Sequence, residues 1–278
     1  MQRPTENPLR IWWCLTGPLA FLPLHAAGIY SDDPEQRGPC VADFAVSSYT
    51  PNVSALVEKI QTSTEVDRAP SKILLISQPN TPGLGRLPSV KREVQAIRNR
   101  TKACSFHGKH ITAENATTTR VKEELPSYDW VHLACHAVQD TATPLKSGFY
   151  LHNERLELAE IMKQQIANAD LAFLSACQTS AGDEKLSEEA VHLAAGMLAA
   201  GYRGVIATMW SIQDDYGPDV ADDFYGYLLQ RRGDDESRSY GSARAAKALH
   251  HTVKRLRERL GDSEMALMTW APYVHFGI

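Results

Sequence analysis

The chain has 278 residues, of which 43% are hydrophobic and 22% are charged, and its formal net charge is −4. This composition excludes collagen-like, coiled-coil and disordered chains, and a chain of this length buries a conventional core without disulfides or a structural metal. Lys and Arg are scattered and form no dense basic stripe, so we expect no nucleic-acid partner.

The cysteines and the apolar segments indicate the compartment. Five cysteines, at 14, 40, 104, 135 and 177, form no CxxC pair, which is typical of a reducing environment. Pro18, Pro23 and His25 interrupt the apolar run at 11–27, and no stretch approaches the roughly 20 apolar residues of a membrane helix. We therefore expect a soluble cytoplasmic protein with no membrane contact.

Short apolar runs alternate with amphipathic segments in chain order. The runs predict strands at 11–14, 41–49, 72–77, 130–135, 149–152, 171–177, 204–210 and 270–278. The amphipathic segments predict helices at 51–63, 89–101, 117–125, 158–166, 187–200, 219–231 and 242–260. Several strands are apolar on both faces, and the helices between them allow the crossovers that parallel strands need. The pattern predicts one α/β domain over 1–278 with a mostly parallel sheet, and the Pro- and Gly-rich segments 31–39 and 78–88 are linkers within it.

Two predicted strands end in reactive side chains, at His136 and at Cys177. In open α/β sheets, ligands bind beyond the carboxyl ends of the strands. Neighbouring strands lie about 4.8 Å apart, so the two side chains would meet if these strands are adjacent. An imidazole beside a thiol lowers its pKa and accepts its proton, which makes a nucleophile near neutral pH. The alternative is a small core cysteine, but the polar turn after Cys177 favours the nucleophile.

The remaining histidine and carboxylate candidates do not indicate a metal or cofactor site. His132 and His136 are about 13 Å apart on a strand, too far to share a zinc ion, so His132 is expected in the core. Without a metal cluster or a Gly-rich phosphate loop, we expect no metal and no cofactor, which disfavours a small-molecule enzyme. Asp214 and Asp215 follow a predicted strand; they are either charges at a helix start or ligands for a basic substrate side chain.

Five motifs in order resemble the CHAT domain family. They are the run at 11–28, His-Leu-Ala-Cys-His-Ala at 132–137, Leu-Ser-Ala-Cys-Gln-Thr at 174–179, the run at 199–210, and Trp-Ala-Pro-Tyr-Val-His-Phe-Gly at 270–277. The resemblance covers nearly the whole chain. It implies a caspase-like three-layer α/β/α sandwich and a cysteine-peptidase dyad of His136 and Cys177.

The resemblance also assigns supporting roles. It implies that the backbone N–H groups of Ala137 and Cys177 hold the oxyanion, although relatives carry Gly at the first position. Ser175 stands where a substrate-pocket Asp occurs in some relatives, which leaves the residue preferred before the scissile bond (P1) open.

The same resemblance implies a protein or peptide substrate and a role in signalling or a cell-death-like pathway. Helical-repeat or sensor domains, in cis or in trans, are the expected activating partners. Only about ten residues separate Cys177 from the next predicted helix, so we expect no maturation cleavage there. The alternative is a catalytically silent CHAT module that binds other proteins.

Overall fold

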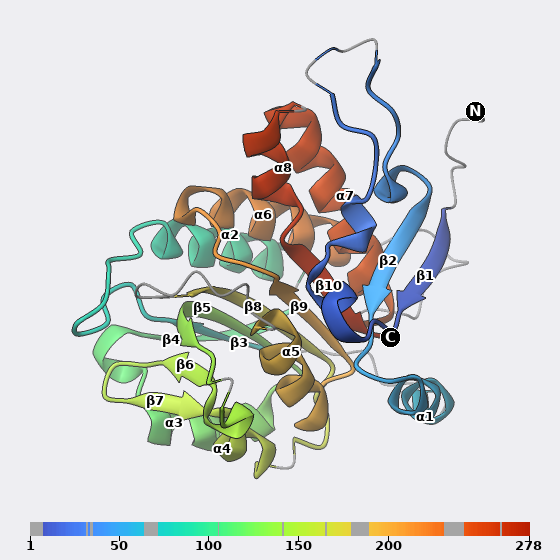
Figure 1. The fold of residues 1–278 in the computed structure, drawn as a ribbon. Helices are drawn as coiled ribbons and strands as arrows, with labels where there is room; N and C mark the ends of the chain where they lie inside the picture. Colours follow the sequence, from blue (N-terminus) through green and yellow to red (C-terminus); the bar gives the residue numbers. More distant parts are fainter. Residues whose placement is uncertain are drawn as a thin grey trace.

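The computed structural model describes residues 8–31, 33, 36–63, 72–104, 106–140, 142–164, 166–178, 189–230, 242–261 and 263–278. Within these ranges a ten-stranded sheet runs through the molecule in the order β1-β2-β10-β9-β8-β5-β3-β4, with β6 and β7 beside β5 (Figure 1). The strands are β1 (Leu9–Trp13), β2 (Ala45–Tyr49), β3 (Lys72–Ser77), β4 (His107–Thr112), β5 (Trp130–Val138), β6 (Gly148–Tyr150), β7 (Arg155–Glu157), β8 (Leu171–Gln178), β9 (Gly204–Thr208) and β10 (Tyr273–Gly277).

The sheet is mostly parallel. Strands β9, β8, β5, β3 and β4 run in one direction, and β10 joins them antiparallel to β9. Strands β1 and β2 run parallel to β10 and extend the sheet on that side. The short β6–β7 hairpin pairs antiparallel with the end of β5.

Helices cover both faces of the sheet, which gives three layers (Figure 1). They are α1 (Val53–Ser63), α2 (Val90–Ala103), α3 (Thr118–Glu124), α4 (Leu158–Met162), α5 (Glu189–Ala199), α6 (Gly217–Leu228), α7 (Ser242–Leu260) and α8 (Glu264–Trp270). One apolar core lies between the sheet and α2, α6 and α7, and the other lies on the face of α3, α4 and α5. The predicted α/β sandwich with a mostly parallel central sheet is confirmed.

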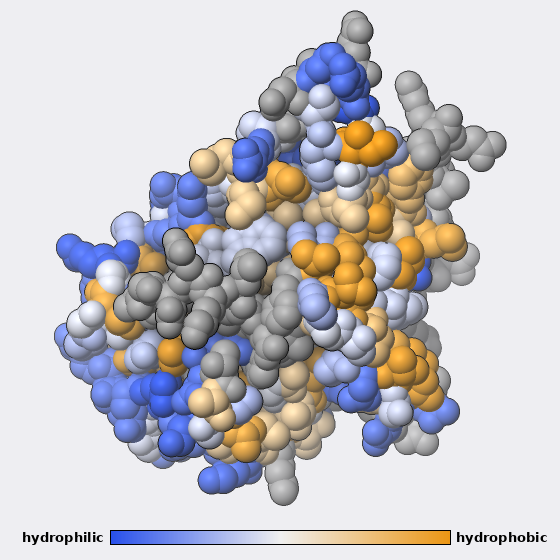
Figure 2. Space-filling view, in the orientation of Figure 1, coloured by the Kyte–Doolittle hydropathy of each residue, from blue (hydrophilic) through white to orange (hydrophobic). Residues whose placement is uncertain are grey.

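Helix α1 is the least covered of the described helices. Its Lys59 ammonium donates to the backbone carbonyls of Leu198 and Tyr202, at the end of α5. Val53, Val57 and Ile60 remain exposed, and Figure 2 shows apolar surface in the region where Figure 1 places α1. No described helix combines the length and the apolar character needed to cross a membrane.

The differences from the predicted elements occur where the apolar pattern is weak. The segment 41–49 begins with a short 3-10 turn, Val41–Asp43, so the strand occupies only its second half. Strand β4 was not predicted because it lies at the sheet edge and Ile111 is its one buried residue. Strand β7 was not predicted because three residues are too few to establish a period. The predicted strand 270–278 begins only at Tyr273, because Trp270 is the last residue of helix α8, which was not predicted. The predicted helix start at 187 lies outside the described residues.

His25 joins the N-terminal segment to the core as a neutral imidazole. Its Nε2 lies 2.9 Å from the Ala271 carbonyl, which only accepts, so Nε2 carries the proton and Nδ1 accepts from the Tyr49 hydroxyl at 2.8 Å. Burial lowers the pKa of His25 to about 4, against a smaller opposing effect of the Ala271 hydrogen bond. The unfolded chain, with an ordinary histidine pKa near 6.5, therefore binds this proton first as the pH falls.

We expect this difference to lower the free energy of unfolding between pH about 6.5 and 4, by up to about 3 kcal/mol at the lower limit. Urea denaturation of the wild type and of His25→Gln measures it, and the variant should show the shallower fall. His275 is also buried with a lowered pKa, but both proteins keep it. The difference between their two pH dependences therefore comes from His25. His107→Gln, at an exposed position, is the control; an identical slope in wild type and His25→Gln would contradict the assignment.

A second buried polar group joins α2 to the sheet. The Glu93 carboxylate lies 3.0 Å from His132 Nε2, and both side chains are almost fully buried. The Tyr225 hydroxyl of α6 lies 3.2 Å from the other ring nitrogen, so His132 is a satisfied core residue, as predicted.

Removing one partner leaves a buried polar group unsatisfied, so Glu93→Ala should lower the free energy of unfolding by roughly 2–4 kcal/mol. The matched control is Asp222→Ala, which breaks the exposed pair with Arg100 and should cost no more than about 1 kcal/mol. Urea titration of both variants checks the difference, and equal losses would show that burial does not set the strength of these pairs.

Candidate active site

The candidate site lies where β5 and β8 end. These strands are parallel neighbours paired from Trp130↔Leu171 to Ala137↔Gln178, and His136 is the register partner of Cys177. The backbone positions of the two predicted residues are therefore directly opposite each other across one strand spacing, about 4.8 Å. The backbone of Cys177 is described, whereas its side chain lies outside the described part of the structure.

Strand alternation assigns the face of the sheet. Val131, Leu133 and Cys135 belong to the core of α3, α4 and α5, and Trp130 on the same strand belongs to the opposite core. Because side chains alternate along a strand, position 136 falls on the face of Trp130, which α2 and α6 cover. Register places position 177 on the same face.

His136 is oriented by a backbone carbonyl. It is 4% exposed, and its Nε2 lies 2.7 Å from the carbonyl oxygen of Gly85. The carbonyl only accepts, so Nε2 carries the proton in the neutral imidazole. Nδ1 is buried and finds no hydrogen-bond partner among the described groups. The neutral ring is thus fixed with an unprotonated nitrogen, as a general base requires.

Gly85 belongs to the segment that the sequence indicates only as a linker. Residues 78–89, here called the 78–89 loop, connect β3 to α2 and cross the end of β5. A backbone carbonyl contributes to His136 without a characteristic side chain, so no residue pattern marks it in advance. The one sequence signal is the high Pro and Gly content of the loop.

Ala137 has strand neighbours on both sides, Phe149 on β6 and Gln178 on β8. It does not have a positive φ, so its Cβ causes no backbone strain in place of the Gly of relatives. Its backbone is held in the sheet beside the site. The oxyanion role of its N–H, and that of Cys177, stay predictions.

Ser175, Asp214 and Asp215, the predicted substrate-binding residues, have different surroundings in the structure. Ser175 is buried, opposite Ala134, two residues before Cys177 and therefore on the same face. Asp214, in the turn after β9, accepts a hydrogen bond from the backbone N–H of Ser89 at 2.8 Å. Asp215 is an exposed carboxylate 3.5 Å from the guanidinium of Arg92. Contact of any of them with a substrate stays a prediction.

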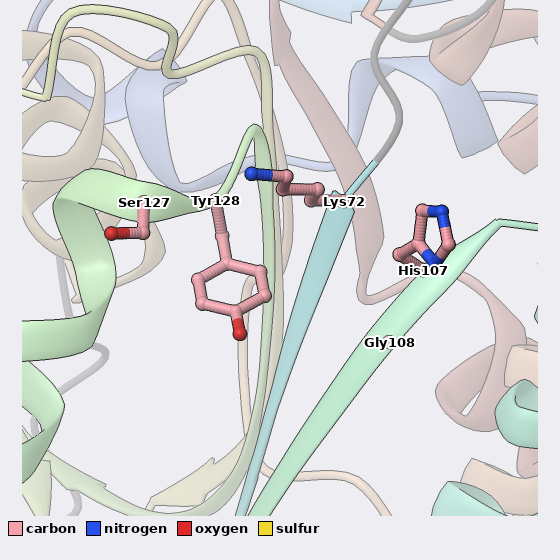
Figure 3. A pocket seen from close by; sticks show the side chains of 5 residues that line it. All are labelled: Lys72, His107, Gly108, Ser127 and Tyr128. Carbon is pink, nitrogen blue, oxygen red and sulfur yellow. The ribbon is translucent and has the colours of Figure 1, made fainter.

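A pocket lies at the other end of the sheet, where the strands begin. Lys72, His107, Gly108, Ser127 and Tyr128 line a pocket of about 220 Å³, shown in Figure 3. Lys72 and His107 are register partners at the first residues of β3 and β4, so the pocket lies at the amino ends of these strands, away from His136. Among the described residues, no three His, Cys, Asp or Glu side chains gather to form a metal site.

Comparison with known proteins agrees with this architecture. The family model of the CHAT domain matches residues 1–278. The crystal structure of the Arg specific cysteine proteinase gingipain R (RGPB) is similar with a TM-score of 0.58 and 13% identity, over 90% of this chain and 58% of that chain. The complex of Porphyromonas gingivalis RgpB pro- and mature domains matches with a TM-score of 0.54 and 10% identity, over 84% of this chain and 55% of that one.

The chain thus spans less than two thirds of either gingipain chain, and the similarity is one of fold. No curated protein matches the sequence. The family match extends over the whole chain, and the sheet has the order and covering helices described above. The chain belongs to the CHAT domain family and has a caspase-like α/β fold.

Proposed function

We propose that this chain is a cysteine endopeptidase in which His136 and Cys177 form the catalytic dyad. The observation that carries the proposal is the register pair of these residues, together with the hydrogen bond from His136 Nε2 to Gly85. That bond fixes the tautomer in which Nδ1 is free to accept a proton.

In the proposed reaction, His136 Nδ1 accepts the proton of the Cys177 thiol, and the thiolate attacks the carbonyl carbon of the scissile peptide. The backbone N–H groups of Cys177 and Ala137 stabilise the oxyanion. The protonated His136 then donates to the leaving amine as the C–N bond breaks, which leaves a thioester on Cys177. His136 next deprotonates a water molecule that attacks the thioester, and the carboxylic acid and the thiol are released.

The substrate class is a protein or peptide, and we propose a basic residue at P1. The gingipain that shares the fold is described as Arg specific. In this chain the carboxylate of Asp215 is largely exposed, with an 84% accessible side chain, and can meet a cation. Ser175, buried on the dyad face, is the proposed second wall of the pocket.

We further propose that the protein acts in the cytoplasm, in signalling, and that a sensor or helical-repeat domain activates it in cis or in trans. Three cysteines support a reducing compartment, because Cys14, Cys40 and Cys104 form no disulfide.

Cleavage of a peptide library with varied P1 residues tests the reaction. Cys177→Ala should abolish cleavage, and His136→Ala should lower kcat/KM by at least about 100-fold, because the general base is lost. Cys104→Ala and His107→Ala, at exposed positions away from the dyad, are matched controls that should stay within about twofold of wild type. Equal activity in Cys177→Ala and wild type would contradict the dyad.

Alkylation of Cys177 tests the dyad without a substrate. An ordinary thiol has a pKa near 8.5, so at pH 7 a histidine-activated Cys177 should react with iodoacetamide at least about tenfold faster than Cys104 in the same chain. His136→Ala should remove this advantage. Mass spectrometry of the two peptides measures both rates. If wild type cuts no peptide and Cys177 reacts no faster than Cys104, the chain is instead a protein-binding CHAT module.

A further inference from the structure

The contact that orients His136 depends on the position of a loop. Gly85 offers only its backbone carbonyl, so the 2.7 Å hydrogen bond to His136 Nε2 is kept only while the 78–89 loop keeps its place over β5. A displacement of about 1 Å would lengthen this bond beyond the usual hydrogen-bond range.

Several contacts fix the loop internally and against the sheet. The Gln78 N–H donates to the Ala134 carbonyl at 2.9 Å, and the Leu87 N–H donates to the Pro79 carbonyl at 3.0 Å. Asn80 and Arg86 form a β-bridge, and the Arg86 guanidinium donates to the Asn80 side chain. Near the far end, Leu87 packs with Val90 and Ala134 in a small buried cluster.

The far end of the loop is also held by a residue distant in sequence. Asp214 accepts the N–H of Ser89 at 2.8 Å, and Ser89 is 2% exposed. This bond joins a carboxylate to the N–H of the residue that caps the N-terminus of α2, a favourable arrangement because the helix dipole places positive charge there. Asp214 and Asp215 both follow β9, so two hydrogen bonds from Ser89, the shorter one to Asp214, connect the β9–α6 turn to the loop that orients His136.

We propose that Asp214 is a positioning residue for the dyad: through Ser89 it holds the 78–89 loop, and through the Gly85 carbonyl it keeps His136 in the tautomer that accepts a proton from Cys177. This inference rests on the proposed function. It assigns the two aspartates different roles. Asp214 accepts the buried backbone N–H of Ser89 at 2.8 Å, whereas the exposed Asp215 accepts only the Ser89 hydroxyl, at 3.2 Å, and lies 3.5 Å from the Arg92 guanidinium.

The alternative for Asp214 is a direct charge contact with a basic P1 residue, and one pair of variants separates the two. An asparagine at this position keeps an oxygen that accepts from the Ser89 N–H but loses the charge. If Asp214 positions the loop, Asp214→Asn should therefore stay within about threefold of wild type, whereas Asp214→Ala should lower both kcat and the rate of Cys177 alkylation at pH 7 by about tenfold. If Asp214 binds P1, both variants should raise KM for basic peptides alone and leave alkylation unchanged, which would overturn the proposal.

The same bond is tested from its other end. Ser89 has φ −75°, an angle that proline adopts, so Ser89→Pro removes the N–H while Asp214 stays in place. It also removes the hydroxyl that donates to Asp215 and accepts from Arg92, so Ser89→Ala, which removes the hydroxyl alone, is compared with it and should leave alkylation unchanged. Ser89→Pro should reproduce the loss seen in Asp214→Ala, and the double variant should be no slower than either single one, because both remove the same contact. Additive losses would contradict the proposal. Asp219→Asn and Asp219→Ala, which change an exposed carboxylate 4.0 Å from the Arg259 guanidinium, are the matched controls and should leave alkylation unchanged.

Nitrogen NMR of the His136 ring gives a readout that needs neither activity nor alkylation. Wild type and Asp214→Asn should show the tautomer protonated at Nε2, and Asp214→Ala should show a mixture of both tautomers. An unchanged His136 spectrum in a folded Asp214→Ala variant would overturn the positioning role by itself. A Cys177 that is unreactive in wild type, with His136 still responding to Asp214→Ala, would instead count against the peptidase and leave the positioning contact standing.

Discussion

The parallel pairing of β5 with β8 is the contact on which the rest of the molecule depends. Both strands are buried, and along β5 the residues alternate between two separate helix-covered cores. A shift of one residue would move every apolar side chain of a strand into the wrong core, so burial fixes the register strongly. The same register sets His136 opposite Cys177. The packing that stabilises the fold thus also determines the relative position of the two candidate catalytic residues.

Buried hydrogen bonds then fix the helices relative to this central pair. Asp170, directly before β8, accepts from the Trp130 indole at 2.8 Å and from the Ser242 hydroxyl at 2.7 Å, which anchors the start of α7. Glu93 anchors α2 to His132 in the same way. The core offers these polar groups few other hydrogen-bond partners. Each hydrogen bond therefore favours one placement of the helix that it joins. Because α2 follows the 78–89 loop, its placement also limits where Gly85 lies.

The carboxyl ends and the amino ends of the parallel strands carry different groups. At the carboxyl ends of β3, β5, β8 and β9, loops from distant parts of the sequence converge. There the Gly85 carbonyl meets the His136 imidazole, and the Asp214 carboxylate bonds the far end of the same loop at Ser89. Such convergence is a general consequence of parallel sheets, whose strands all end at one edge. At the amino ends, the pocket beside Lys72 and Tyr128 is small and bordered by the first residues of the strands. The proposed peptidase reaction therefore takes place at the carboxyl ends of the strands, where the loops converge.

The sequence by itself determined the elements with a clear apolar period: β3 occupies 72–77 as predicted, and β8 covers the predicted 171–177. It also singled out His136 and Cys177, because a reactive side chain ending a buried strand is a local signal. The edge strand β4 gave no such signal, since Ile111 is its one buried residue and the others are exposed or half-buried. Only the tertiary structure decided the strand order, the contact of Gly85 with His136 and the hydrogen bond between Ser89 and Asp214, 125 residues apart. A backbone carbonyl or N–H is present at nearly every position, so which one meets a given side chain depends on packing and not on residue type.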